Sequence, residues 1–230
     1  MAGRALASRR TLALLDGLGV ALGLWGMLAP VPYGLCIAAL LVAPVAAIGI
    51  AWASHGAVSL NDRRRQKRPH VGALFLFPAL ILGARGLLDF NVLDWTAPLI
   101  LATPLAVLMT FTAVRAELEF RRWFWVLFLL PLTLAWSWGA ISEANGIFDR
   151  TPAQVVSTEV LQKRMSGVRS VSYHLEIAPT TIAGMGTEVE VRRALYRQVA
   201  VGGRICLELH GGSLGWRWFR PKACDASASP

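Results

Sequence analysis

Two short stretches near the carboxyl end of the chain carry side chains that could bind a metal ion. His174 and Glu176 lie two residues apart, and so do Glu208 and His210, in runs of alternating apolar and polar residues that predict β-strands. Residues two apart project from the same face of a strand, so each pair presents an imidazole and a carboxylate together. Both groups are common zinc ligands. The alternative, which we favour, is a solvated strand face with polar contacts between strands. We therefore predict no metal centre and no cofactor.

Cys206 and Cys224 are candidates for a disulfide bond. Cys206 lies in the strand-like run ICLEL, where alternation points its side chain away from the apolar face. Cys224 lies in a stretch, residues 223–230, that we predict to be a loose tail able to reach it. A disulfide persists only in an oxidising compartment, and the sequence leaves its formation open. The remaining cysteine, Cys36, lies in an apolar run and is expected to be a small packing residue.

Most of the chain has the composition of a protein that lies in a lipid bilayer. Of its 230 residues, 55% are hydrophobic and the mean hydropathy is +0.50, whereas a soluble domain is roughly 45–50% apolar. A helix of 18 residues covers about 27 Å, close to the thickness of the hydrocarbon core. We therefore predict a membrane α-helical bundle of about five transmembrane helices in residues 1–145. The predicted spans are 11–28, 34–53, 71–88, 96–114 and 123–141.

The third span is the weakest of the five, because Arg85 interrupts it near its end and must reach the lipid headgroups. A soluble helical bundle is disfavoured, since its helices would keep a polar face that these segments lack.

Basic residues gather in alternate loops of the predicted bundle. The amino-terminal segment and loops 54–70 and 115–122 together hold eleven Lys and Arg residues. The intervening loops 29–33 and 89–95 hold none. Because Lys and Arg concentrate in cytoplasmic loops, the amino terminus is predicted to be cytoplasmic and the segment after the fifth span to lie outside. The main topology determinants are Arg63, Arg64, Arg65, Lys67 and Arg68.

The same basic loop, NDRRRQKRPH, raises the question of nucleic-acid binding. No aromatic residue or groove-reading element accompanies its charges, so we predict no nucleic-acid partner. The lipid bilayer, with its anionic headgroups, is the predicted partner of these side chains.

Ionisable residues inside membrane spans are the first candidates for function. In the predicted spans only Asp16 and Arg85 qualify, and both lie near span ends, where water or headgroups can solvate them. They belong to opposite leaflets, so no direct pair is expected. The motif HExxH and a glycine-rich phosphate loop are absent from the sequence. We predict no catalytic residue, and we favour a protein that is not an enzyme.

The first span carries two further signals. SRRTLALL, residues 8–15, resembles a twin-arginine export signal, but we favour an uncleaved anchor helix because no small-x-small cleavage site follows it. Gly19 and Gly23 form a small-residue face of the kind that lets helices approach closely. We expect this face to pack within the bundle.

The carboxy-terminal part predicts a second domain. Residues 146–222 have charges throughout and short alternating runs, which predict a small all-β domain, either a barrel or a sandwich. Gly202 and Gly203 indicate a hairpin, and HGGSLG indicates another turn. The predicted strands are 154–161, 171–177, 187–191 and 205–209.

Part of this domain resembles a known kind of module. LYRQVAVGGRICLELHGGSLG, residues 195–215, is similar to the end of small β-rich modules in uncharacterised bacterial inner-membrane proteins. The positions that match are Tyr196, Val199, Gly202, Ile205 and Gly215, while Gly203 replaces an aspartate of that pattern. QVVSTEVLQKR and YHLEIAP are similar to its opening strands. The resemblance implies a bacterial inner membrane and a periplasmic domain, without an activity.

These observations predict a multi-pass inner (cytoplasmic) membrane protein that acts by interaction or as a scaffold through a periplasmic β module. Its partner would be a periplasmic or membrane protein. The alternatives are a small-solute transporter or channel subunit, which a polar cavity through the bundle would favour, and a membrane-embedded enzyme, which a catalytic constellation at one depth would favour.

Overall fold

The computed structural model describes residues 9–55, 57–60, 69–116, 122–167 and 171–224. The chain divides into two compact units. The helical unit comprises Met1–Asp89 and Thr96–Ile147, and the β unit comprises Phe90–Trp95 and Phe148–Pro230. The division predicted after residue 145 therefore assigned the short segment Phe90–Trp95 to the wrong unit, since this segment belongs with the strands.

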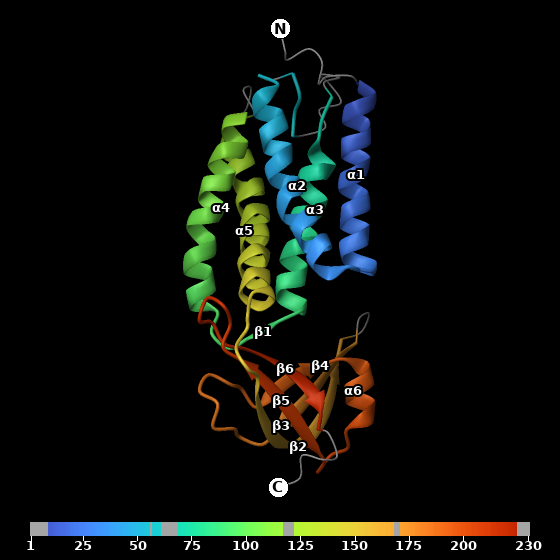
Figure 1. Cartoon of the computed structure of the whole chain (residues 1–230), viewed down its shortest axis with the longest axis vertical. Coiled ribbons are helices and arrows are strands. Elements are labelled where there is room, and N and C mark those ends of the chain that lie inside the picture. Colours follow the sequence, from blue (N-terminus) through green and yellow to red (C-terminus); the bar gives the residue numbers. More distant parts are fainter. Residues whose placement is uncertain (1–8, 56, 61–68, 117–121, 168–170, 225–230) are drawn as a thin grey trace. The chain divides into compact units, whose positions relative to one another are not determined.

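Five long helices, each running opposite to the one before it in the chain, form the helical unit (Figure 1). They are α1 (Arg9–Leu28), α2 (Tyr33–Ala53), α3 (Gly72–Leu88), α4 (Thr96–Ala116) and α5 (Arg122–Ile147). Among the described residues, α1, α2, α4 and α5 contain segments long and apolar enough to cross a membrane, whereas α3 is apolar but shorter, with 17 residues. Helix α5 continues well past the predicted end of its span at Ile141.

The helical unit is apolar outside as well as inside. Its core contains fully buried residues such as Leu40, Ala79 and Leu82. Its outer faces expose large apolar side chains, including Ile100 and Leu127, each 74% exposed. Contiguous exposed apolar surface is unfavourable in water but matches a lipid environment. The unit therefore has the construction of a multi-pass membrane bundle.

Glycines on α1 allow it to pack directly on α3, which also contacts α2 and α5. A Cβ atom added to Gly19 would collide with the backbone at Leu74, and one added to Gly23 would press on Phe77. The predicted small-residue face thus packs inside the bundle, as expected.

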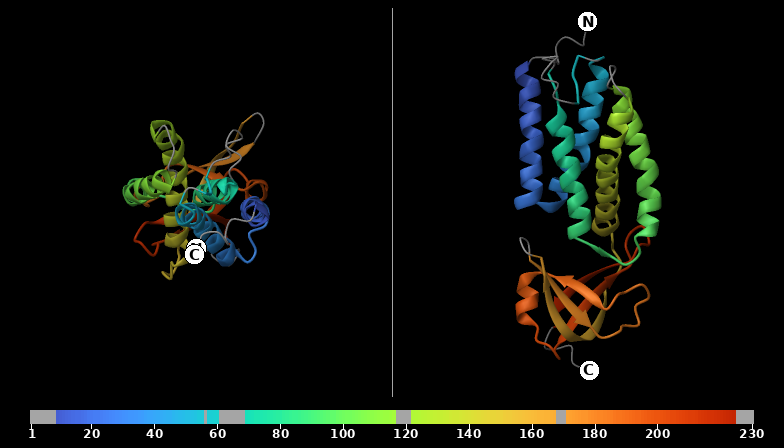
Figure 2. Two further views of the ribbon diagram at one scale, coloured as in Figure 1. Left: turned by 90° about the horizontal axis from the view of Figure 1, so that it is seen from above. Right: turned by 180° about the vertical axis from the view of Figure 1, so that it is seen from behind.

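The β unit is one curved antiparallel sheet of six strands with a short helix beside it (Figure 2). Its strand order is β1-β6-β5-β2-β3-β4. The strands are β1 (Asn91–Val92), β2 (Gln154–Ser166), β3 (Ser172–Ile177), β4 (Glu188–Val191), β5 (Arg204–His210) and β6 (Trp218–Ala223), and the helix is α6 (Arg193–Gln198).

The long strand β2 makes the sheet curl. Its first half pairs with β5 and its second half pairs with β3, with a register irregularity between Val160 and Gln162. Such irregularities bend a strand and increase its twist. The apolar residues that alternate along the strands then meet in one core, which includes Val160, Leu175, Ile205 and Leu207, each with 0% exposure.

Two details of the predicted β domain are wrong. Gly202 and Gly203 do not join two strands, because helix α6 precedes them; their backbone instead pairs with Val160 of β2. The tail predicted from residue 223 begins too early, since Ala223 is the last residue of β6 and pairs with Ile205. The turn predicted at HGGSLG is confirmed and leads from β5 into β6.

Candidate functional site

Asp16 caps the amino-terminal end of the neighbouring helix α3. Its Oδ1 accepts a hydrogen bond from the backbone N–H of Ala73, in the first turn of α3, at 2.6 Å. Its Oδ2 lies 3.3 Å from Nδ1 of His70. The first N–H groups of a helix lack partners within the helix and carry its positive dipole end, so a carboxylate is stabilising there. The role of Asp16 is therefore structural.

Arg85 performs the complementary task at the other end of the same two helices. Its Nε and Nη2 donate hydrogen bonds to the carbonyl oxygen of Gly26, in the last turn of α1, at 2.8 and 2.6 Å. Its Nη1 lies 3.3 Å from Oδ1 of Asp89. Asp16 and Arg85 thus join α1 to α3 at opposite ends of α3, in agreement with the expectation that they do not pair.

Arg85 also belongs to a polar cluster that gathers side chains from three helices, α2, α3 and α5. The hydroxyl oxygen of Tyr33, the first residue of α2, lies 2.9 Å from Oδ2 of Asp89 and 2.7 Å from Oε2 of Glu143. Glu143 comes from α5, and Asp89 directly follows α3. We call Tyr33, Arg85, Asp89 and Glu143 the Tyr33 cluster. It contains two carboxyl groups, one phenol and one guanidinium group.

Glu143 is the most deeply buried member of the Tyr33 cluster. Its exposed fraction is 0%, and within the part of the chain that the structure describes its Oε1 has no hydrogen-bond partner. Arg85 and Asp89, by comparison, have side chains that are 18% and 12% exposed. A buried polar atom without a partner is rare in folded proteins and calls for an explanation.

Close packing of α5 on α3 fixes the depth of Glu143. A Cβ atom on Gly139 would collide with the backbone of Leu82, and one on Gly86 would press on Gly139 and on Ser142. The two helices therefore cross backbone to backbone one turn before Glu143. Helix α5 continues beyond this contact to Ile147.

Three members of the Tyr33 cluster, namely Tyr33, Asp89 and Glu143, were not predicted as site residues from the sequence. Glu143 stands in a stretch, EANGIFDRTP, that suggests a turn between domains, and Tyr33 and Asp89 stand at span ends, where polar side chains are ordinary. The sequence does contain a signal for Glu143. If the fifth predicted span is extended by one turn, the helix includes this carboxylate at the level of Arg85.

The four metal-ligand candidates lie on strands that are not neighbours. Strand β2 separates β3, which carries His174 and Glu176, from β5, which carries Glu208 and His210. Among the described residues, no group of three or more His, Cys, Asp and Glu side chains is placed to hold a metal ion.

Each pair has ordinary polar partners instead. His174 lies 3.4 Å from Glu188 on the next strand and 3.0 Å from the hydroxyl of Ser166. Glu208 forms an ion pair of 2.6 Å with Lys222 on β6. These are cross-strand polar contacts of the kind that stabilise a solvated sheet face.

His210 belongs to a small structural cluster around Asp149. The imidazole ring of His210 stacks on Trp218 with 4.0 Å between ring centroids. The side chain of Asp149, 2% exposed, accepts hydrogen bonds from Thr151, from the backbone N–H of Gly212 and from the indole N–H of Trp218. Burial alone would raise the pKa of Asp149, but these hydrogen bonds outweigh it and hold the pKa below its usual value.

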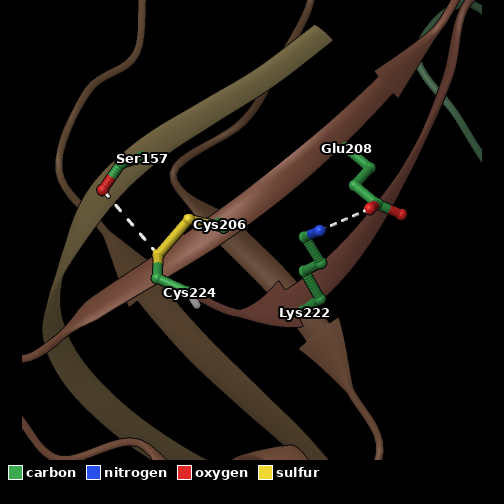
Figure 3. Close-up of a disulfide and its surroundings, with 5 residues drawn as sticks. All are labelled: Ser157, Cys206, Glu208, Lys222 and Cys224. Carbon is green, nitrogen blue, oxygen red and sulfur yellow. Dashed lines mark hydrogen bonds and ion pairs between the residues drawn. A yellow bond between two sulfur atoms is a disulfide. The ribbon is translucent and has the colours of Figure 1, made fainter. Parts of the chain in front are cut away.

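Cys206 and Cys224 are joined by a disulfide bond, with their Cα atoms 5.0 Å apart (Figure 3). Cys206 lies on the face of β5 opposite its core residues, as alternation predicts, but it is only 2% exposed. The hydroxyl of Ser157 lies 3.9 Å from the sulfur of Cys224, and the Glu208–Lys222 ion pair lies beside the bond on the same two strands. The disulfide therefore links β5 to the residue that follows β6.

The predicted topology determinants, Arg63, Arg64, Arg65, Lys67 and Arg68, lie outside the described residues. Comparisons with protein-family models, with curated proteins and with solved structures found no match.

Proposed function

We propose that this chain is a multi-pass protein of the bacterial inner membrane whose helical unit holds the β unit in the periplasm, where the β unit binds a protein partner. The observation that carries the proposal is strand β1. This strand comes from the loop between α3 and α4, yet it pairs with β6, at Asn91 with Phe219 and at Val92 with Trp218.

The pairing of β1 with β6 constrains the threading of the chain. Two segments that share one sheet must lie on the same side of a membrane. Residues 90–95 and 148–224 are separated in the chain by α4 and α5, which are both long enough to cross. Two crossings return the chain to the side that it left, so the connectivity supports α4 and α5 as a transmembrane hairpin.

Two further features support a periplasmic β unit. The eleven Lys and Arg residues of the amino-terminal segment and alternate loops favour a cytoplasmic location for those segments, which places the loop after α3 and the segment after α5 outside. The Cys206–Cys224 disulfide is of the kind that persists in an oxidising compartment. The assignment to bacteria rests on the resemblance of residues 195–215 to modules of bacterial inner-membrane proteins.

A binding role is supported by apolar side chains that the β2–β3 region exposes. Leu161 and Val171 are each 48% exposed, and Met165, on β2, is 62% exposed. Met165 and Val171 lie at the same end of the β2–β3 pair, whereas Leu161 lies at its other end. Isolated exposed apolar residues are common, but apolar side chains exposed together at one end of a strand pair are typical of a contact surface.

Site-specific photo-crosslinking in intact cells tests this role. A photoreactive residue at Met165 should give a discrete adduct with one membrane or periplasmic protein. The same residue at Val201, which is 59% exposed and lies before β5, is the matched control and should give none. Equal labelling from the two positions, or no adduct from Met165, would contradict a binding role for this surface.

A transporter or channel subunit is the second candidate function. The observation that favours it is the ionisable side chain of Glu143, fully buried in the helical unit among apolar helices.

A further inference from the structure

The hydrogen bonds of the Tyr33 cluster depend on how many protons the phenol and the two carboxyl groups carry. The hydroxyl of Tyr33 has one proton, yet two carboxyl oxygens, Asp89 Oδ2 and Glu143 Oε2, lie within hydrogen-bond distance of it at 2.9 and 2.7 Å. A hydroxyl donates one hydrogen bond and accepts others, whereas an ionised carboxylate only accepts. Both contacts are hydrogen bonds only if one of the two carboxyl groups is protonated and donates to the phenol oxygen.

The surroundings of the two carboxyl groups indicate which of them carries the proton. Asp89 faces the guanidinium group of Arg85, at 3.3 Å from its Nη1, and its side chain is partly accessible to solvent. Glu143 has 0% exposure, and among the described residues its Oε1 has no hydrogen-bond partner. Arg85 is close enough to interact with Glu143 electrostatically, but its ion pair is with Asp89. An unpaired buried charge is far more costly than a buried neutral acid.

The remaining groups around Glu143 leave this assignment unchanged. Helix α2 contributes Tyr33 and the thiol of the buried Cys36, which is close enough to interact electrostatically with Glu143 and Arg85. Helix α1 contributes the carbonyl oxygens that Arg85 already binds. On α4, the described basic residue is Arg115, at the opposite end of the unit.

We propose that Glu143, Tyr33 and Asp89 form a proton-binding site in the helical unit, in which Glu143 carries the proton and Tyr33 connects it to Asp89. The direction of donation is then Glu143 to Tyr33 and Tyr33 to Asp89. Transfer moves the Glu143 proton to the phenol oxygen while the phenol proton moves to Oδ2 of Asp89. The products are an ionised Glu143, a neutral Tyr33 and a protonated Asp89, so the proton count is unchanged. The partly exposed Asp89 exchanges its proton with solvent.

This site is independent of the proposed role of the β unit, and it supplies what a proton-linked membrane protein needs: a buried acid with a hydrogen-bonded path toward the surface. Its ligand is the proton itself. The path runs through side chains of α5, α2 and α3, so a relative movement of these helices would make or break it.

Infrared spectroscopy of the full-length protein in detergent tests the site, because the C=O stretching band of a protonated carboxyl group is separate from the bands of amides and carboxylates. Near neutral pH the wild type should show this band, with a shift on exchange into D₂O. Glu143→Gln should abolish the band and Asp89→Asn should retain it. Glu176→Gln, on β3, is the matched control and should leave the band unchanged.

Tyr33→Phe provides a second test that does not depend on the folding of the Glu143 variant. Removal of the phenol oxygen breaks the hydrogen bond of Glu143, so the band should change in frequency and its deuterium exchange should become slower. Absence of the band from the wild type near neutral pH would overturn the proposal. Persistence of the band in folded Glu143→Gln, its loss in Asp89→Asn, or an unchanged band in Tyr33→Phe would do the same.

Discussion

Asp149 and Glu143 are both buried carboxyl groups, but they differ in the number of hydrogen-bond donors around them. Asp149 accepts hydrogen bonds from Thr151, Gly212 and Trp218, and both of its oxygens have partners. Glu143 contacts Tyr33 through one oxygen, and the other oxygen has no partner among the residues that the structure describes. A fully satisfied carboxylate holds a structure together, whereas a partly satisfied one is a candidate for function.

We expect Asp149 to make the β unit sensitive to acid. Because its pKa is lower in the folded state than in the unfolded state, its contribution is fully present above the usual Asp value of about 4 and is lost as the pH falls through the folded pKa. Asp149→Asn should destabilise the β unit at neutral pH by about 1–3 kcal/mol and should remove this part of the acid sensitivity. Hydrogen exchange of peptides from β5 and β6 in the full-length protein, corrected for the intrinsic rate at each pH, measures both effects. An unchanged acid sensitivity in the variant would show that other groups cause it.

At the scale of elements, the close crossing of α3 and α5 depends on Gly139, which has no side-chain atoms to separate the two backbones. A Cβ atom at Gly139 would meet the backbone of Leu82, which no side-chain movement can relieve. Gly139→Ala should therefore lower the free energy of unfolding of the purified protein by about 1–3 kcal/mol, although alanine has the better helix propensity. Thermal unfolding measures the change. Gly49→Ala is the matched control, since nothing lies near the added atom in α2, and it should be neutral or stabilising. Equal effects of the two substitutions would contradict the close crossing.

The disulfide is the second stabilising feature at this scale, and it holds the neighbouring strands β5 and β6 together. The two cysteines are 18 residues apart in sequence, and closing a loop of this size contributes about 3 kcal/mol in the chain-entropy model. Cys206→Ser should reduce the protection of β5 and β6 from hydrogen exchange by a corresponding amount. A reductant should have the same effect on the wild type and no further effect on the variant. A wild type that is insensitive to reductant would count against a stabilising role.

The elements that were predictable from the sequence are those whose pattern is local. Apolar runs long enough to cross a bilayer predicted the helices, and alternation predicted β2, β3, β4 and β5. Strand β1 was not predictable, because two residues in a loop between spans carry no pattern; the pairing with β6 defines it. Helix α6 was missed because LYRQVA, read with the run after it, fits a strand of a hairpin. Glu143 was missed because its burial comes from contact with α3, which is tertiary.

At the scale of the whole molecule, three independent features bear on the threading of the chain. The basic residues lie in alternate loops, the disulfide lies in the β unit, and the sheet of the β unit includes a strand from a loop between spans. Each of them favours the same threading of the chain, although they depend on different physics: the cost of moving charge across a membrane, the redox state of a compartment and backbone pairing.

If the charges of NDRRRQKRPH set the orientation of the chain in the membrane, their removal should make that orientation less uniform. Changing its five basic residues to Asn leaves only six in the other predicted cytoplasmic segments, so we expect a mixture of two orientations. Protease accessibility of a carboxy-terminal tag in spheroplasts measures the proportion. A uniform orientation would mean that the other loops suffice.

The location of the β unit is the central claim, and a pair of reporter fusions tests it most directly. A reporter that is active only in the periplasm is fused after Pro230 in one protein and at Arg65 in another. The account predicts activity from the fusion at Pro230 and none from the fusion at Arg65. The opposite result would contradict the charge-based orientation and would place the disulfide-bonded sheet in the cytoplasm.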